Sequence, residues 1–299
     1  MQPISLTTRY VPMFKSTVLK SLNYLALGCS CITLLACSHK PQFTLQQVWK
    51  TAGFLVPESV LLVGEGAQQR IFVSQIDGQG GDADGKGAIA EINSDGALID
   101  ANWISGLNAP KGMAAFNNRL YVADLTELVI IDIAQKQIIQ KLPLPQAKFA
   151  NDVAVDKNGV VYISDTMAHR VYKFADGNAS VLVKDTDNAN GLWVTDSGLM
   201  INCAEELKFY DFQQQKLTTL ESGFSKNLDG IAALDDKHFL LSVWAGKIYE
   251  YTLGGGKAVL LDSTEQKINT ADIALDQKSR VLYVPNFLNN TVTAYKVLP

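Results

Sequence analysis

A five-residue pattern that recurs six times is the feature that most limits how this chain can fold. Each copy opens with a polar or small residue, here called the anchor, and runs into an apolar strand, as in segment 190–194 (Asn-Gly-Leu-Trp-Val). The anchors are Glu58, Lys111, Asn151, Asn190, Asp229 and Ala271. Subtracting their numbers gives steps of 53, 40, 39, 39 and 42 residues, which is the period of a four-stranded propeller blade. The sequence therefore predicts an all-β fold, a six-bladed β-propeller.

The two ends of the predicted propeller complete each other. After its anchor, the last repeat contains only three strand-like runs, 272–275, 281–285 and 292–297, whereas segment 43–50 alternates like a strand ahead of the first anchor. We expect this N-terminal strand to complete the last blade, which closes the ring and removes an open sheet edge. The expected domains are a propeller over 45–299 and a tether over 37–44.

The first 36 residues have the composition of an export signal. They contain Arg9, Lys15 and Lys20 with no acidic residue, followed by an apolar run over 22–36. This run is shorter than a transmembrane helix requires, so the sequence predicts a cleaved signal peptide over 1–36.

The end of the apolar run predicts a lipid anchor. Its last residues, Leu-Leu-Ala followed by Cys37, resemble the bacterial lipobox, which implies cleavage before Cys37 and its acylation. An ordinary signal peptide with incidental cysteines is the alternative. Two or more acyl chains hold a protein stably on a membrane. Because Ser38 is not the usual aspartate retention signal, we expect a lipoprotein of the bacterial cell envelope, at the outer membrane and facing the periplasm.

Net charge and cysteine content argue against nucleic-acid binding and against an internal disulfide. Without residues 1–36 the chain keeps 23 of its 26 basic residues and all 30 acidic ones, a net charge of 23 − 30 = −7. An acidic exported domain is not expected to bind nucleic acid. Only Cys37 and Cys203 would remain after processing, so no internal disulfide is expected, and Cys203 is interpreted as a small buried residue.

A glycine- and aspartate-rich insertion over 77–87 lengthens the first repeat. Its segment 80–86 spells G-x-x-x-x-G-K, but Gly87 replaces the required Ser or Thr and a strand follows, so no nucleotide site is expected. Asp82 and Asp84 do not have the spacing of an EF-hand. A solvated hairpin is the expected structure.

The anchors are the candidate chemical groups. The inner strands of a propeller line its channel, so residues that open these strands should meet at one mouth although they are far apart in sequence. Glu58, Asn151, Asn190 and Asp229 would bring two carboxylates and two amides together, an oxygen-only set that suits Ca²⁺ and also Mg²⁺ or Mn²⁺. The alternative is that Asn-Gly and Asp-Gly simply open their strands as turn formers.

Four blocks resemble the senescence marker protein, gluconolactonase and luciferin-regenerating enzyme (regucalcin-like) family. The blocks are 57–60 (Pro-Glu-Ser-Val), 149–152 (Phe-Ala-Asn-Asp), 190–192 (Asn-Gly-Leu) and 228–230 (Leu-Asp-Gly). The resemblance covers roughly residues 45–298. It implies a six-bladed propeller with one divalent metal in the channel, Ca²⁺ first and Mg²⁺, Mn²⁺ or Zn²⁺ as alternatives, and a family that includes lactone hydrolases.

The resemblance also assigns roles to residues. It implies that Glu58, Asn190 and Asp229 bind the metal, that Asp229 is in addition the general base, and that Asn151 contacts substrate or a metal-bound water. Lys111 stands where sugar-lactonase members usually place a substrate-binding arginine. It is expected either to orient an anionic or hydroxylated substrate or to form a surface salt bridge.

Two further acidic residues follow anchors directly. Asp152 and Asp272 are expected to support the metal ligands through hydrogen bonds to neighbouring anchor backbones rather than to bind the metal themselves. Ser59, where many members have glycine, is a departure from the family pattern.

Two hypotheses for function follow. The first is a metal-dependent hydrolase of a lactone or related ester, in which the metal polarises the carbonyl and Asp229 accepts a proton from water. The second is a non-catalytic propeller lipoprotein that binds a partner or a small ligand. A serine triad is not expected, because the sequence has no G-x-S-x-G motif and its three histidines are scattered. The four tryptophans, Trp193 included, are expected to fill the spaces between blades.

Overall fold

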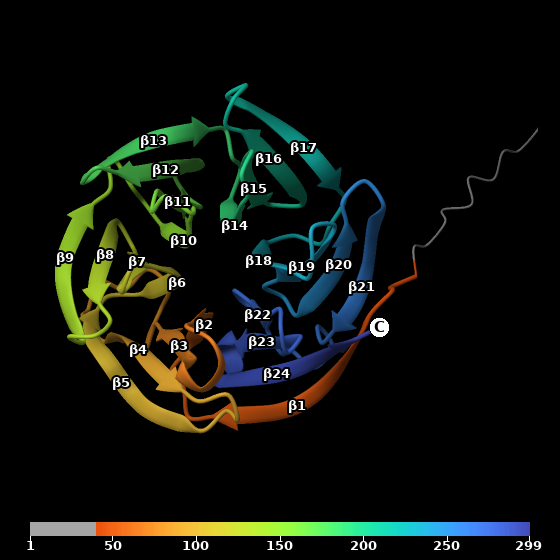
Figure 1. Cartoon of the computed structure of the whole chain (residues 1–299), viewed down its shortest axis with the longest axis horizontal. Coiled ribbons are helices and arrows are strands. Elements are labelled where there is room, and N and C mark those ends of the chain that lie inside the picture. Colours follow the sequence, from red (N-terminus) through yellow and green to blue (C-terminus); the bar gives the residue numbers. More distant parts are fainter. Residues whose placement is uncertain (1–39) are drawn as a thin grey trace, which may run out of the picture. The chain divides into compact units, whose positions relative to one another are not determined.

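The chain folds into six four-stranded antiparallel sheets that surround a central axis as blades (Figure 1). The structure is a computed structural model and describes residues 40–299. The prediction of an all-β, six-bladed propeller is confirmed. The predicted signal peptide over 1–36, the lipidation site Cys37 and the start of the predicted tether lie outside the described residues.

The first three blades follow one another along the chain. Blade 1 contains β2 (Pro57–Val63), β3 (Arg70–Gln75), β4 (Gly87–Ile92) and β5 (Leu98–Leu107). Blade 2 contains β6 (Pro110–Phe116), β7 (Arg119–Asp124), β8 (Glu127–Asp132) and β9 (Gln137–Pro143). Blade 3 contains β10 (Ala150–Val155), β11 (Val161–Asp165), β12 (Arg170–Ala175) and β13 (Asn178–Lys184).

The last three blades complete the ring. Blade 4 contains β14 (Ala189–Val194), β15 (Gly198–Cys203), β16 (Glu206–Asp211) and β17 (Lys216–Ser222). Blade 5 contains β18 (Leu228–Ala233), β19 (His238–Val243), β20 (Lys247–Thr252) and β21 (Gly256–Asp262). Blade 6 contains β22 (Ala274–Asp276), β23 (Val281–Asn286), β24 (Thr291–Leu298) and the N-terminal β1 (Thr44–Ala52). Two short 3₁₀ turns are η1 (Gly66–Gln68) and η2 (Phe287–Asn289).

Hairpin turns set the register inside each blade. In blade 3, Asp176 and Gly177 both have positive φ, 51° and 78°, as a tight turn between two twisted antiparallel strands requires. In blades 1 to 5 the order of strands from the channel outward follows the sequence, and in blade 6 β1 lies outermost, so β2, β6, β10, β14, β18 and β22 face the channel (Figure 1).

The N-terminal strand closes the ring, as predicted. β1 pairs antiparallel with β24, from Thr44 opposite Leu298 to Ala52 opposite Thr291. Just ahead of β1, the backbone N–H groups of Gln42 and Phe43 donate to Glu250 Oε2 in blade 5, at 2.8 and 3.3 Å. The two ends of the propeller are therefore joined by a ladder of hydrogen bonds and by a buried carboxylate.

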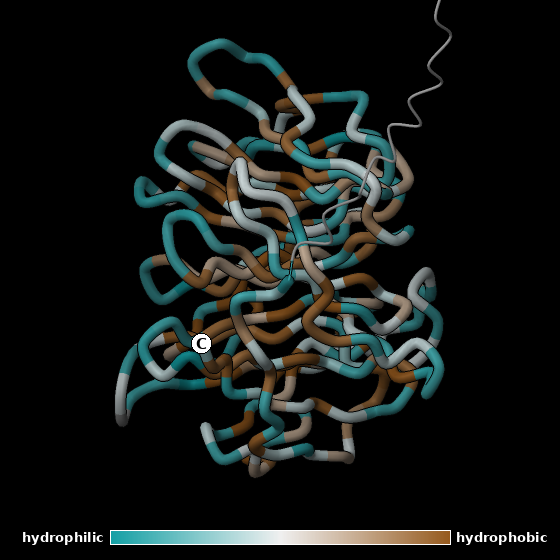
Figure 2. The backbone as a smooth tube through the Cα atoms, turned by 90° about the vertical axis from the view of Figure 1, so that its right-hand side faces the viewer, coloured by the Kyte–Doolittle hydropathy of each residue, from teal (hydrophilic) through white to brown (hydrophobic). Residues whose placement is uncertain are grey.

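The hydrophobic core is divided among the six junctions between blades. The junction of blades 2 and 3 buries Tyr121 and Ile163 in one cluster, and the junction of blades 6 and 1 buries Tyr283 and Val73 in another. Each remaining junction has a cluster of the same kind. Figure 2 shows that the apolar segments lie inside and that polar loops lie along the edges. Each blade therefore depends on its neighbours to bury its apolar faces.

Within residues 40–299, no helix has the length and apolar character needed to cross a membrane.

Candidate functional site in the central channel

The inner strands carry the same irregularity at the same place. In blade 3, Ala150 pairs with Asp165 and Val153 pairs with Ile163, so three steps on the inner strand match two on its partner. The same β-bulge occurs in blades 1, 2, 4 and 5, always at the anchor and the residue after it. A bulge breaks the alternation of side chains and re-aims them. Consecutive residues such as Asn151 and Asp152 are consequently both buried beside the channel.

Buried serines on the second strands satisfy the bulged backbone. Ser74 Oγ accepts the N–H of Ser59 at 2.9 Å, Ser164 Oγ accepts that of Asp152 at 2.8 Å, and Ser242 Oγ accepts that of Gly230 at 2.8 Å. Sequence reasoning missed these serines. A signal was present, because each one ends an apolar run in the second strand of its repeat.

Carboxylates at the ends of second strands hold the segments that lead into the anchors. Asp124 accepts the N–H groups of Asn108 and Ala109, just before Lys111. Asp165 accepts those of Lys148 and Phe149, just before the next anchor. These charge-assisted bonds fix where each inner strand begins, and hence where its anchor side chain starts.

Glycines let neighbouring inner strands approach closely. A Cβ on Gly191 would collide with the carbonyl oxygen of Asp229, and a Cβ on Gly230 would collide with the Asp272 carboxyl. The Asn-Gly and Asp-Gly pairs, for which turn formation was the alternative, therefore serve the packing of strand against strand around the channel. Each glycine leaves room that brings its anchor close to the next blade.

The polar anchors are buried, and several of their oxygens have no partner. Glu58 is 5% exposed and Asp229 is 1% exposed, while Asn190 is half-buried. Within the described residues, Glu58 Oε2, Asn151 Oδ1 and Asp229 Oδ1 are buried without a hydrogen-bond partner. Buried polar atoms are normally paired, so three unpaired oxygens on blades 1, 3 and 5 mark a place where positive charge or a hydrogen-bond donor would be stabilised.

The pKa shifts of the anchor carboxyls also indicate a place that would stabilise positive charge. Burial raises the pKa of Glu58 well above its usual value, and the nearby charges of Asp229 and Asp272 raise it further. Burial and Asp272 likewise raise the pKa of Asp229, although the Asn190 side chain, within hydrogen-bonding reach, lowers it. The carboxylates thus repel one another in a poorly solvated space, and a cation between them would relieve that repulsion.

Lys111 is buried rather than at the surface. It is 2% exposed, its Nζ donates to the carbonyl of Ala109 at 2.8 Å, and it lies 4.2 Å from the centre of the Phe149 ring. The alternative of a surface salt bridge is therefore wrong, because the lysine is enclosed and has no carboxylate of residues 40–299 within ion-pair distance. Burial lowers the pKa of Lys111 to about 8, against the opposing effects of Glu58 and Asp124.

The two additional acids make different contacts. Asp152 accepts the N–H of Val153 with Oδ1 and that of Leu192, on the next blade, with Oδ2, both at 2.6 Å. Asp272 accepts the Ser59 hydroxyl with Oδ2 at 2.5 Å, and its own N–H donates to the carbonyl of Glu58 at 3.0 Å. Burial raises the pKa of both carboxyls, that of Asp272 to about 7.

The oxygen set fits a hard cation only if amides take part. Among residues 40–299, no group of three or more histidine, cysteine, aspartate or glutamate side chains is arranged to hold a metal ion. An ion at the anchors would therefore need the amide oxygens of Asn151 or Asn190 beside Glu58 and Asp229. Hard divalent cations accept such mixed carboxylate and amide sets, and the unpaired oxygens on Glu58, Asn151 and Asp229 are consistent with one.

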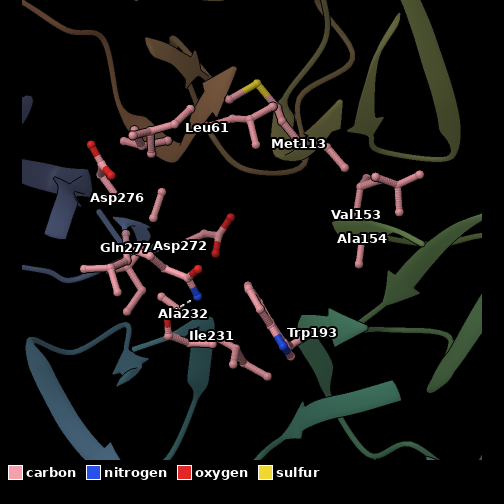
Figure 3. A pocket seen from close by; sticks show the side chains of 18 of the residues that line it. Leu61, Met113, Val153, Ala154, Trp193, Ile231, Ala232, Asp272, Asp276 and Gln277 are labelled. Atoms are coloured by element: carbon pink, nitrogen blue, oxygen red, sulfur yellow. Dashed lines mark hydrogen bonds between the residues drawn. The ribbon is translucent and has the colours of Figure 1, made fainter. Parts of the chain in front are cut away.

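A cavity of about 650 Å³ occupies the channel on the side where the inner strands end (Figure 3). Trp193, Met113 and Ile231 line it, together with Asp152 and Asp272. The expectation that Trp193 only fills space between blades is therefore incomplete, because its ring packs against the core of blades 4 and 5 and also faces this cavity.

Other titratable residues lie outside the channel. The histidines of residues 40–299 are His169, whose side chain is half exposed, and His238, which bonds Asp235 in a surface turn at 2.9 Å. Cys203 is buried, as expected, and burial raises the pKa of its thiol to about 12.

Comparison with known proteins supports the class of fold. No protein-family model matches the sequence, and no curated protein matches it either. Solved structures do match, and their likeness supports the propeller fold of this chain.

The particular structures are two lyases. A catalytically inactive histidine-to-alanine form of virginiamycin B lyase from Staphylococcus aureus, with Quinupristin, is 12% identical, has a TM-score of 0.61, and is matched over 85% of this chain and 99% of that one. A streptogramin B lyase structure is 9% identical, with a TM-score of 0.63 over 85% and 98%. At such low identity the likeness shows the fold alone.

Proposed function

We propose that this protein is a hydrolase of a lactone or a related ester, with a divalent cation held by Glu58, Asn190 and Asp229. The observation that carries the proposal is the set of buried, unpaired oxygens on Glu58, Asn151 and Asp229. They lie on inner strands of different blades, each placed by the same bulge. The resemblance of these blocks to the gluconolactonase family supports the same assignment.

Each residue has a chemical task in this proposal. A bound divalent cation, Ca²⁺ first and Mg²⁺, Mn²⁺ or Zn²⁺ as alternatives, supplies Lewis-acid polarisation of a carbonyl. Asp229, whose carboxylate is buried at the start of β18, would accept the proton of the attacking water. Asn151 keeps its amide N–H on Thr166 at 2.9 Å, which leaves its Oδ1 directed as an acceptor for substrate or water.

Lys111 supplies positive charge without occupying the cation site. Its ammonium group is held by the Ala109 carbonyl and the Phe149 ring rather than by a carboxylate. It can therefore orient an anionic or hydroxylated part of the substrate.

Lyase chemistry of the kind named in the similar structures is not favoured. One of those structures is inactive after replacement of a histidine by alanine. In residues 40–299 of this chain, His169 lies in a surface turn and His238 begins β19, and neither lines the channel cavity. The buried carboxylate of Asp229 is instead the group that we propose as the base.

The test uses the full-length protein purified in detergent. Calorimetry with Ca²⁺, Mg²⁺, Mn²⁺ and Zn²⁺ measures cation binding, and a pH-stat measures hydrolysis of a panel of lactones and esters. Asp229→Asn should reduce hydrolysis by at least about 100-fold, the usual contribution of a general base. Asp187→Asn, an exposed aspartate, is the matched control and should leave the rate unchanged.

Two outcomes would reject the proposal. Full activity of Asp229→Asn removes that residue from the mechanism. Cation binding without turnover of any ester would favour the other hypothesis, a non-catalytic propeller lipoprotein that binds a partner or small ligand.

A further inference from the structure

The channel cavity, which we call the well, is separate from the proposed catalytic site. Its wall is formed by the second halves of the inner strands, and its rim by the turns after β2 and β22. None of the polar anchors lines it. The well therefore lies along the later residues of the inner strands, and Asp152 and Asp272 are the lining residues nearest in sequence to the anchors.

One acceptor in the well has no partner. Asp272 is 8% exposed, and Oδ2 accepts the Ser59 hydroxyl. No hydrogen bond to Oδ1 is found within residues 40–299, and Figure 3 shows the carboxyl group directed toward the middle of the well. Asp152, in contrast, uses both of its oxygens on backbone N–H groups. Of these two buried carboxyls, Asp272 is thus the one with an oxygen available to a ligand.

The remaining wall defines the shape and charge of that ligand. Trp193, Met113 and Ile231 present a mostly apolar surface around the Asp272 carboxyl. Indole rings attract cations over their faces. At the rim, the carboxyl side chains of Glu65 and Asp276 outnumber the single cation, Lys278.

We propose that the well binds a small organic ammonium ion with an apolar body, such as an alkylamine or arylalkylamine. The ammonium group donates a hydrogen bond to Asp272 Oδ1, and the body packs against Trp193 and the aliphatic wall. A cavity of about 650 Å³ lies within the range of small-molecule sites, which are mainly apolar with a few placed polar groups. An anion is disfavoured because it would meet the Asp272 carboxyl.

The experiment titrates the full-length protein with three probes of similar shape by calorimetry. The probes are 2-phenylethylammonium, uncharged 2-phenylethanol and anionic 3-phenylpropanoate. A chelator is present throughout, so the result does not depend on cation binding or hydrolysis at the anchors. The expected result is saturable one-to-one binding of the ammonium probe, at least about tenfold tighter than the alcohol, since its hydrogen bond is charge-assisted.

Variants locate the binding. Asp272→Asn should weaken the ammonium probe by about tenfold and leave the alcohol within about twofold. Trp193→Leu should weaken the ammonium probe by roughly threefold or more, because the contact between the body of the probe and the indole ring is lost. The exposed-site variant Asp187→Asn should change neither affinity.

Three outcomes would overturn the proposal. They are no saturable binding of the ammonium probe, equal affinity for the alcohol, or unchanged affinity in a folded Asp272→Asn. If Asp272→Asn does not fold, the affinity of Trp193→Leu for the ammonium probe tests the proposal instead. An unchanged affinity in that variant would place the probe outside the well.

Discussion

Gly191 on β14 lies against the backbone of β18, so the substitution Gly191→Ala tests whether this close contact between inner strands builds the site. Gly191 does not have a positive φ, so alanine is allowed there by its backbone conformation. The added Cβ would nevertheless lie inside van der Waals contact with the carbonyl oxygen of Asp229, and 3.0 Å from the carbonyl carbon of Asp229 and from Gly230 Cα. Backbone atoms cannot rotate away, so β14 and β18 must move apart.

The cost follows from overpacking. Forcing an extra methyl group into a packed interior costs about 1–3 kcal/mol, and contact with backbone puts Gly191→Ala at the upper end, about 2–3 kcal/mol. In a domain of this size each kcal/mol lowers Tm by about 2–4 °C, so the expected decrease is about 4–12 °C. Gly81→Ala is the matched control, because its Cβ would meet no atom within 4 Å. Its Tm should change by less than about 2 °C.

Scanning calorimetry of both variants at fixed pH with a chelator measures the difference. Separation of β14 from β18 also moves Asn190 away from Asp229, so cation affinity should fall in Gly191→Ala and not in Gly81→Ala. Equal Tm values for the two variants would refute the view that close strand contact builds the site.

Three further predictions concern charge, closure and the anchor. With cations chelated, raised carboxyl pKa values mean that the folded protein binds more protons than the unfolded chain. The free energy of unfolding should therefore fall as pH rises from about 4, the pKa of an unfolded aspartate, to about 7, that of folded Asp272; a rising Tm across this window would contradict the assignment. Glu250→Ala removes the acceptor of Gln42 and Phe43 and should cost about 1–3 kcal/mol, with faster amide exchange in β1; unchanged exchange there would count against the closure. Cys37→Ser should release the protein from membranes, and unchanged fractionation would show that another cysteine is acylated.

The sequence predicted the architecture because the repeat can be recognised along the chain and its length equals that of one four-stranded blade. A blade needs about 40 residues, and the spacing of the anchors states how many blades there are. The missing fourth strand of the last repeat also predicted that β1 pairs with β24, as it does. Burial of Cys203 followed from its apolar surroundings.

Only the tertiary structure decided how the anchors meet. The alternation of apolar and polar residues in the sequence predicts which side chains of a regular strand share a face. The bulge at Asn151 and Asp152 breaks this alternation. It depends on Ser164, which lies on another strand and accepts the hydrogen bond from the N–H of Asp152. The sequence left open whether Lys111 orients a substrate or forms a surface salt bridge. The structure shows that it is buried against the Phe149 ring, and the burial of one residue depends on neighbours that are distant along the chain. The well behind Asp272 has no sequence signal at all. A cavity is the space that six blades leave unfilled, and it exists only once the ring has closed.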